Sequence, residues 1–236
     1  MKKITHAKNS ISFSFFRSMS MTSILFMVLL FLGISVLFLK HSFQLEGKNA
    51  LQQLSYISGQ FQYYLDATEN YSKTILSDDN VQEYMNDYLS AKYSSRATTN
   101  VKQHIRQIIQ STPFIHSVSL YSDKGLLLVS TEPNSSQMNL VSPPDSPIWR
   151  TGTKKHLSDR HKEVKVLSCI RPFYSINSGQ MLGYVELAIP ETQISAIYAE
   201  YDTSNELFLI DRDGRVQSSP DPTELDSRYE YTDFIK

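Results

Sequence analysis

Residues 115–125 have the sequence Ile115-His116-Ser117-Val118-Ser119-Leu120-Tyr121-Ser122-Asp123-Lys124-Gly125, in which apolar and polar side chains alternate up to Tyr121. A period of two is typical of a strand with one buried face. Residues 122–125 have the composition of a turn, and residues 126–130 supply a second apolar strand. The stretch therefore predicts a β-hairpin.

In the sequence before this hairpin, the apolar residues recur with the period of a helix. Residues 42–76 predict one long helix, and shorter helices are expected at 81–91 and 96–110. Strands are expected at 163–174 and 181–189, then a helix opened by Pro190 and a hairpin at 206–219. We expect residues 132–162, with four prolines, to be irregular apart from a short helix near Trp149. Helices followed by an antiparallel sheet indicate an α+β fold.

The charge is divided unevenly along the chain. Residues 1–40 carry five basic and no acidic side chains, whereas the other 196 residues carry 18 basic and 24 acidic ones. Residues 18–40 are apolar and long enough to span a bilayer, too long for a signal peptide, and not followed by a small-x-small cleavage site. Because basic flanks stay in the cytoplasm, we expect a single-pass anchor in the cell membrane, residues 1–17 inside and 41–236 outside.

The long helix after the anchor carries an apolar stripe that has two interpretations. Its members, spaced three and four apart, are Leu51, Leu54, Ile57, Phe61, Tyr64, Leu65, Tyr71 and Ile75. The stripe either pairs with a second copy, giving a homodimer through a signalling stalk, or packs on its own domain. The sequence alone leaves both interpretations open.

Three phrases carry a resemblance to a known family. They are the hairpin at 115–125, the strand phrase Gly179-Gln180-Met181-Leu182-Gly183-Tyr184-Val185-Glu186-Leu187-Ala188-Ile189-Pro190, and the hairpin Leu207-Phe208-Leu209-Ile210-Asp211-Arg212-Asp213-Gly214-Arg215-Val216-Gln217-Ser218-Ser219. With the long helix that precedes them, they resemble the extracytoplasmic double Cache sensors of bacterial membrane receptors, whose central sheet is PAS-like. The resemblance implies a helical part at 41–112, a membrane-distal sheet at 113–201, and the start of an incomplete membrane-proximal subdomain at 202–236.

The run from Leu51 to Tyr88, which includes the phrase from Ile75 to Tyr84, is similar to Gram-positive sensor histidine kinases that pair with AraC-type response regulators. Those proteins continue into a second membrane helix, a HAMP linker and a kinase core. None of these follows here, so we expect a fragment or a truncated product, with a two-component histidine kinase as its parent. An AraC-type membrane regulator, a chemoreceptor, or a surface-anchored binding protein without signalling are the alternatives.

The residues present give no catalytic motif, no cofactor motif and no metal site. The Asp211-x-Asp213-Gly214 phrase lacks the later calcium ligands of an EF-hand and is expected to be a turn with a positive φ at Gly214. The acidic outer part excludes nucleic acid as a partner, so the lipid bilayer and a small extracellular ligand remain. The candidate ligand-binding residues are Tyr121, Trp149, Arg150, Arg171 and Tyr174, because Trp offers an apolar face and Arg can clamp a carboxylate.

Overall fold

The fold is described from a computed structural model that covers most of the chain. The residues that it describes are 3–92, 94–132, 138, 146–155, 163–199, 207–211, 213–219, 221–225 and 227–229, with backbone alone for 3–14 and Lys155. The chain divides into two compact units, residues 1–56 and 57–236, and each is described by itself.

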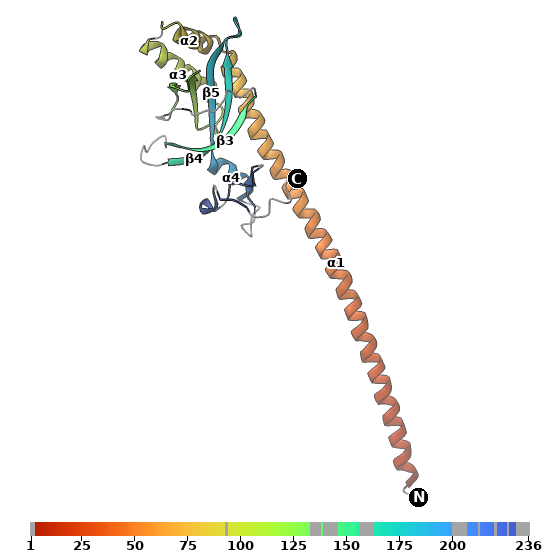
Figure 1. The fold of residues 1–236 in the computed structure, drawn as a ribbon. Coiled ribbons are helices and arrows are strands. Elements are labelled where there is room, and N and C mark those ends of the chain that lie inside the picture. The colour runs from red at the N-terminus through yellow and green to blue at the C-terminus, as the bar shows by residue number, and fades with distance from the viewer. Residues whose placement is uncertain are drawn as a thin grey trace. The chain divides into compact units, whose positions relative to one another are not determined.

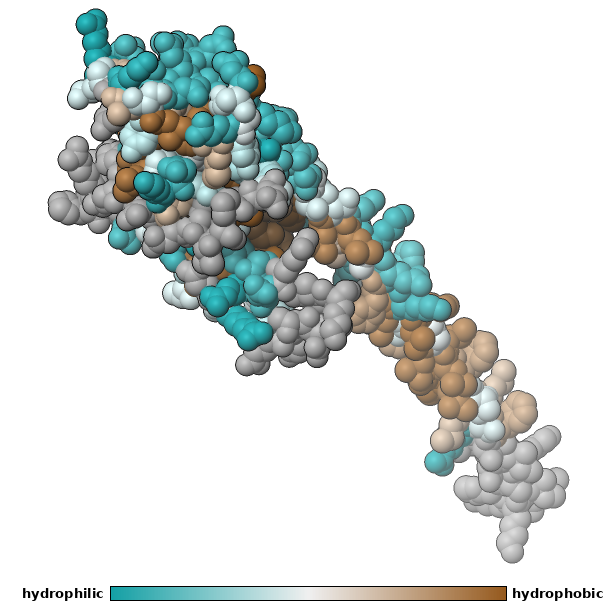
Figure 2. All heavy atoms as spheres, turned by 45° about the horizontal axis from the view of Figure 1, so that its top comes forward, coloured by the Kyte–Doolittle hydropathy of each residue, from teal (hydrophilic) through white to brown (hydrophobic). Residues whose placement is uncertain are grey.

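Helix α1 (Lys3–Ser77) begins in the first unit and ends in the second. Among the described residues it is the one helix long and apolar enough to cross a membrane. Figure 2 shows the apolar side chains of this helix as a brown stretch, and those from Ile24 to Leu39 are exposed. A helix without a polar face, exposed on all sides, is typical of a segment surrounded by lipid. The long helix predicted at 42–76 is confirmed, and it continues the apolar segment without a break.

Two short helices follow α1, and both have polar N-caps. The Asp78 carboxylate accepts hydrogen bonds from the amides of Asn80 and Val81 and so begins α2 (Asp79–Leu89). The Ser94 hydroxyl accepts from the amide of Ala97 and begins α3 (Ser95–Ile109). These caps satisfy amides that the first helical turn leaves without partners. Both predicted helices are confirmed to within two residues.

The second unit is built on a five-stranded antiparallel sheet in the order β2-β1-β5-β4-β3 (Figure 1). Its strands are β1 (Ser117–Ser122), β2 (Leu127–Ser130), β3 (Ile148–Lys155), β4 (Glu163–Tyr174) and β5 (Met181–Pro190). The hairpin predicted at 115–130 is confirmed as β1 and β2. The α+β fold with a central antiparallel sheet is confirmed as well.

Strand β3 corrects one prediction. Residues 148–155 were expected to be irregular, with a short helix near Trp149, but they form an edge strand paired along its length with β4. The prolines at 143, 144 and 147 precede the strand rather than interrupt it. Two threonines and a tryptophan favour a strand in this segment. Pro172 fits β4 because β3 ends opposite Ile170, which leaves that edge of β4 without a ladder partner.

The core lies between the sheet and the helices. One sheet face contributes Val118, Leu120, Leu167, Phe173, Val185 and Leu187, and the helices contribute Ile75, Val81, Met85, Val101 and Ile105. The other face carries a smaller buried cluster of Tyr121, Ile170 and Tyr184. All six residues of β1 are buried, so the expectation of a half-buried strand is wrong, because both faces of β1 are covered.

After β5 the chain enters α4 (Glu191–Ala199), and a small hairpin follows, made of β6 (Leu209–Ile210) and β7 (Val216–Ser218). A 3-10 turn at Pro222–Glu224 comes next. Gly214 has a φ of 76°, which confirms the expected turn. The hairpin is joined to α4 by a buried hydrogen-bond chain: the Ser218 hydroxyl donates to Glu191 at 2.7 Å and lies 2.5 Å from the Tyr198 hydroxyl.

Candidate functional site: a charged hollow on the sheet face

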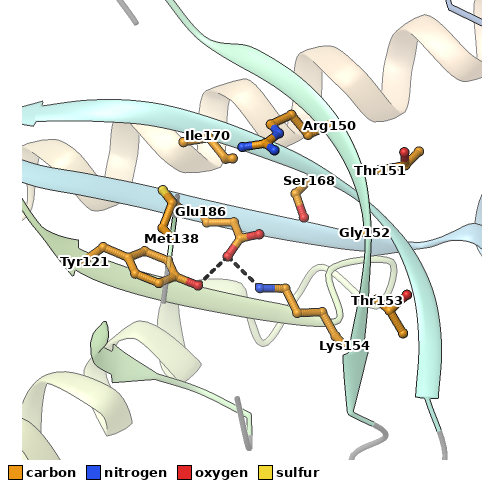
Figure 3. A pocket seen from close by; sticks show the side chains of 10 residues that line it. All are labelled: Tyr121, Met138, Arg150, Thr151, Gly152, Thr153, Lys154, Ser168, Ile170 and Glu186. Atoms are coloured by element: carbon orange, nitrogen blue, oxygen red, sulfur yellow. Dashed lines mark hydrogen bonds and ion pairs between the residues drawn. The ribbon is translucent and has the colours of Figure 1, made fainter. Parts of the chain in front are cut away.

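The sheet face opposite the helices contains a hollow of about 260 Å³ (Figure 3). Its lining comes from four strands and one loop residue: Tyr121, Met138, Arg150, Thr151, Gly152, Thr153, Lys154, Ser168, Ile170 and Glu186. The register of the strands places the lining residues on one face of the sheet, because Arg150 lies opposite Ser168 and Ile170 lies opposite Glu186. Residues directly opposite each other in a ladder share a face.

Glu186 is the centre of this hollow. Its Oε2 accepts one hydrogen bond from the Lys154 ammonium at 2.6 Å and another from the Tyr121 hydroxyl at 2.8 Å. The dashed lines in Figure 3 mark both. The Lys154 and Glu186 side chains are only 8% and 9% exposed. Burying two charges costs several kcal/mol unless they are paired and hydrogen-bonded, so such a pair is weak evidence for stability alone. A buried charged cluster at the wall of a hollow is a candidate binding site.

The apolar part of the lining consists of Met138, Ile170 and the ring of Tyr121. Met138 and Ile170 pack against Tyr121 and Tyr184. Burial raises the pKa of Tyr184, and the neighbouring Tyr174 and Asp123 raise it further. The phenol therefore stays protonated and neutral at physiological pH. The hollow thus offers charged groups on one side and a small apolar wall on the other.

The structure brings two of the five predicted ligand-binding residues into this hollow. Tyr121 and Arg150 line it, and Figure 3 shows the guanidinium of Arg150 on the same side of the strands as the Glu186 carboxylate. Trp149 is half-buried against the helix-side core, because neighbouring residues of a strand point to opposite faces. Tyr174, at the end of β4, is 45% exposed and does not line the hollow.

Arg171 lies on the helix side of β4 and contacts α1. Its Nε donates to the hydroxyl of Ser72 at 2.9 Å, and its guanidinium lies 3.2 Å from the Glu69 carboxylate. Arg171 directly follows Ile170, which lines the hollow. The structure therefore does not place Arg171 with the other candidates. It makes Arg171 a link between the strand that carries the site and helix α1.

Sequence reasoning missed Lys154, Ser168 and Glu186. Lys154 was overlooked because residues 148–155 were expected to be irregular. Glu186 left a signal, since it is one carboxylate inside the apolar run from Tyr184 to Ile189. A charged residue in a buried strand is almost always paired. Ser168 left no such signal, because its role depends only on the register of β4 with β3.

Other hollows in the described part of the second unit include two larger ones. One of about 430 Å³ runs between α2 and α3, with Glu83, Asp87 and His104 among its lining residues. The other, of about 1100 Å³, lies between α1, β3 and the β6–β7 hairpin. Asp211 lines it, but both of its carboxylate oxygens already accept hydrogen bonds within the turn, from the amides of Asp213 and Arg215 and the side chain of Gln217.

No family model and no curated protein match the chain. Solved structures do match it in fold. The sensor domain of the histidine kinase DctB from Vibrio cholerae has a TM-score of 0.56 at 17% identity, covering 75% of this chain and 68% of that one. A domain of a sensory box/GGDEF family protein from Vibrio parahaemolyticus has a TM-score of 0.54 at 13% identity, covering 80% and 77%.

A third similar structure is the ligand-binding domain of the Campylobacter jejuni chemoreceptor Tlp3 in complex with 4-methylisoleucine. It has a TM-score of 0.52 at 12% identity and covers 78% of this chain and 73% of that one. The described part of the chain shares the fold of these sensor and ligand-binding domains. At these identities the likeness establishes the fold, and the residues of the hollow must carry the argument about what this chain binds.

Proposed function

We propose that the chain is the sensory region of a membrane-anchored two-component histidine kinase, and that the hollow binds a small extracellular ligand. The observation that carries the proposal is the buried Lys154–Glu186–Tyr121 cluster at the wall of the hollow, in a Cache-like fold. The described residues of the chain sense rather than catalyse in this proposal, and the catalytic part belongs to the parent kinase.

Membrane anchoring is the second part of the proposal. Residues 18–40 of α1 cross the cell membrane, and the basic residues before them keep the N-terminus in the cytoplasm. The sheet domain then lies outside the cell, where it meets extracellular ligands. Residues 113–201 act as the distal ligand-binding subdomain, and residues 202–236 begin a proximal one.

The contact between Arg171 and α1 supports a route for the signal. A ligand in the hollow would contact Ile170, and the next residue along β4 holds Glu69 and Ser72 of α1. A shift of β4 on binding would therefore change the packing of α1 on the sheet. If α1 can pack on the sheet in two ways, the ligand changes the signal only as far as it binds one of these two arrangements more tightly than the other.

We also propose that α1 forms the interface of a homodimer. The apolar stripe divides in two: Ile57, Phe61 and Leu65 pack against the core, whereas Leu51 and Leu54 are exposed. The exposed part supports pairing with a second copy. An AraC-type regulator or a chemoreceptor would use the same outer part, and Tlp3 has a similar fold.

A thermal-shift screen of the full chain in detergent micelles tests this function. The screen covers small polar molecules, because the hollow has the volume of about nine liquid waters. We expect at least one to raise the unfolding temperature, and Lys154→Gln with Glu186→Gln to remove the effect. Lack of any stabilising compound would contradict the ligand-binding function, and protection of residues 41–236 from external protease on whole cells would contradict the orientation.

A further inference from the structure

The hydrogen-bond chain of Glu191, Ser218 and Tyr198 connects the sheet that carries the hollow to the β6–β7 hairpin. Glu191 and Tyr198 lie on α4, and Ser218 lies on β7. We propose that these three residues form a latch, which transmits a displacement of β5 to the hairpin. The inference rests on the proposed function and deepens it, because it assigns a second route along which a bound ligand acts.

The direction of the hydrogen bonds in the latch follows from the number of protons. Ser218 has one hydroxyl proton, which it donates to Oε1 of Glu191 at 2.7 Å. The Tyr198 hydroxyl, 2.5 Å away, therefore donates to the Ser218 oxygen. Glu191 and Tyr198 lie about two turns apart on one face of α4. A displacement of α4 therefore acts on both hydrogen bonds of Ser218 at once.

Glu191 is a buried carboxylate whose recorded partner is a hydroxyl group. The three residues of the latch are more than nine-tenths buried, and no cation in the described part of the chain pairs with Glu191. The N-terminal end of α4 favours a negative charge, but an apolar contact here would avoid the free-energy cost of burying one. The carboxylate therefore contributes to the position of α4 on β7 more than to stability.

The latch begins directly after the strand that carries the centre of the hollow. Strand β5 contains Glu186, ends at Pro190, and is followed at once by Glu191. It pairs with β1 up to Ala188 and with β4 up to Pro190. A strand that is paired on both sides resists local opening. A shift of β5 at Glu186 therefore reaches Glu191.

On the hairpin, the latch adds a directional contact to an apolar one. Leu209 packs against the core from β6, and Val216 is buried on β7. Apolar contacts are non-directional and allow neighbouring surfaces to slide, whereas hydrogen bonds depend on distance and angle. The hydrogen bonds of Ser218 therefore determine where β7 lies on α4, and the hairpin follows α4 when α4 moves.

Two neighbouring serines provide a matched test. Ser218→Ala removes both hydrogen bonds of the latch, whereas Ser219→Ala removes a hydroxyl that bonds to Glu224 and to the amide of Asp221. Native-state hydrogen exchange of the full chain in detergent micelles measures the opening of α4 and the hairpin, with β4 as the internal reference. We expect Ser218→Ala to quicken exchange in both about fivefold, and Ser219→Ala to leave α4 unchanged.

The conservative change at Glu191 separates the hydrogen bond from the space that the side chain fills. Glu191→Gln retains an oxygen that can accept from Ser218, whereas Glu191→Leu does not. We therefore expect hairpin exchange in Glu191→Gln to stay closer to the wild type than in Glu191→Leu. Equal exchange in these two variants, or equal effects of Ser218→Ala and Ser219→Ala on α4, would overturn the inference.

A double-mutant cycle separates transmission from simple attachment. Tyr121→Phe removes the hydroxyl that donates to Glu186 in the hollow. Changes at distant sites without shared partners combine additively, to within about twofold in an equilibrium constant. We expect the effect of Tyr121→Phe on hairpin exchange to differ between the wild type and the Ser218→Ala variant by more than this factor. Additive effects would show that the latch transmits nothing from the hollow.

The latch is tested without a ligand, so its failure and the failure of the proposed function are distinguishable. If a molecule from the screen binds in the hollow and the cycle is additive, the sensor function stands and the latch inference is wrong. If the cycle shows coupling and no molecule binds, the latch stands as a property of the fold and the proposed function is contradicted.

Discussion

The Lys154 ammonium lies 2.6 Å from Oε2 of Glu186, with both side chains more than nine-tenths buried. The two residues come from strands β3 and β5, which do not pair with each other, and β4 lies between them. The ion pair therefore spans three strands across the floor of the hollow. Both the stability of the sheet and the binding of a ligand in the hollow therefore depend on Lys154 and Glu186.

Replacing one residue of the Lys154–Glu186 pair should lower the free energy of unfolding much more than replacing both. Glu186→Leu leaves the Lys154 ammonium buried without a counter-charge, so we expect the free energy of unfolding to fall by about 3–5 kcal/mol. The double change Lys154→Met with Glu186→Leu should recover most of this loss. Urea unfolding of the full chain in micelles, followed by Trp149 emission, measures both. Equal losses in the single and double variants would contradict the pairing.

The link between Arg171 and α1 should be measurable as a coupling energy. Arg171→Met removes the hydrogen bonds to Ser72 and Glu69, and we expect a loss of about 1–3 kcal/mol, reduced toward the lower value because Glu69 is one-third exposed. Glu69→Gln alone should lower the free energy of unfolding by less than Arg171→Met does. A double-mutant cycle of the two changes isolates the pair, and additive effects would show that they do not interact.

Asp78 predicts a pH-dependent contribution to stability. Burial raises its pKa, but the hydrogen bond and charge of His104 and the amides of Val81 and Asn80 outweigh burial and hold the pKa below its ordinary value of 3.8. The stabilisation is therefore present above pH 3.8 and is lost as the pH falls through the lower folded-state pKa.

The matched variants Asp78→Asn and Asp78→Ala separate charge from capping. Asn still caps α2, so its deficit relative to the wild type should be present at pH 7 and shrink below about pH 4. Ala should lose about 1 kcal/mol more at every pH because the cap itself is gone. Unfolding by urea between pH 2.5 and 7 measures both deficits, and a deficit of Asn that does not change with pH would contradict the role of the carboxylate.

Cys169 should be inert in the folded protein. Burial raises the pKa of its thiol to about 12, with the Arg171 charge opposing and the Glu69 charge adding to the shift. The thiolate is the reactive form, so we expect reaction with a disulfide reagent at pH 8 only after unfolding. Because Cys169 is the one cysteine, its labelling rate reports the opening of the sheet. Rapid labelling of the folded chain would show that β4 is accessible.

Gly183 is required by the close approach of β5 to β1. Its φ is 152°, and a Cβ added there would lie 1.9 Å from the carbonyl oxygen of Tyr121. Gly183→Ala should therefore lower the free energy of unfolding by about 2–3 kcal/mol. Gly59→Ala is the matched control, since Gly59 lies on α1 with open space around it and should gain about 0.5–1 kcal/mol. An unchanged free energy of unfolding in Gly183→Ala would contradict the register of β1 with β5.

Much of the fold was predictable from local sequence, whereas only Tyr121 and Arg150 of the site were predicted. The Asp78 cap, the 115–130 hairpin and the strands on either side of Gly179 each carry their own periodic pattern and turn residues. Strand β3 was missed because nearby prolines indicated an irregular segment. The partners of Glu186 depend on the pairing of strands far apart in the sequence, which no single segment encodes. Trp149 and Arg150 were predicted together, and both line the larger hollow of about 1100 Å³. Of the two, Arg150 also lines the charged hollow, because neighbouring residues of a strand point to opposite faces.

Hydrogen–deuterium exchange of the full chain, with and without a ligand found by the screen, tests the sensor proposal most directly. We predict slower exchange in the strands that carry Lys154 and Glu186, together with a change in the part of α1 around Glu69 and Ser72. Unchanged exchange in β3 and β5 would show that the ligand binds elsewhere. Protection of those strands with no change in α1 would contradict the route by which the site is proposed to signal.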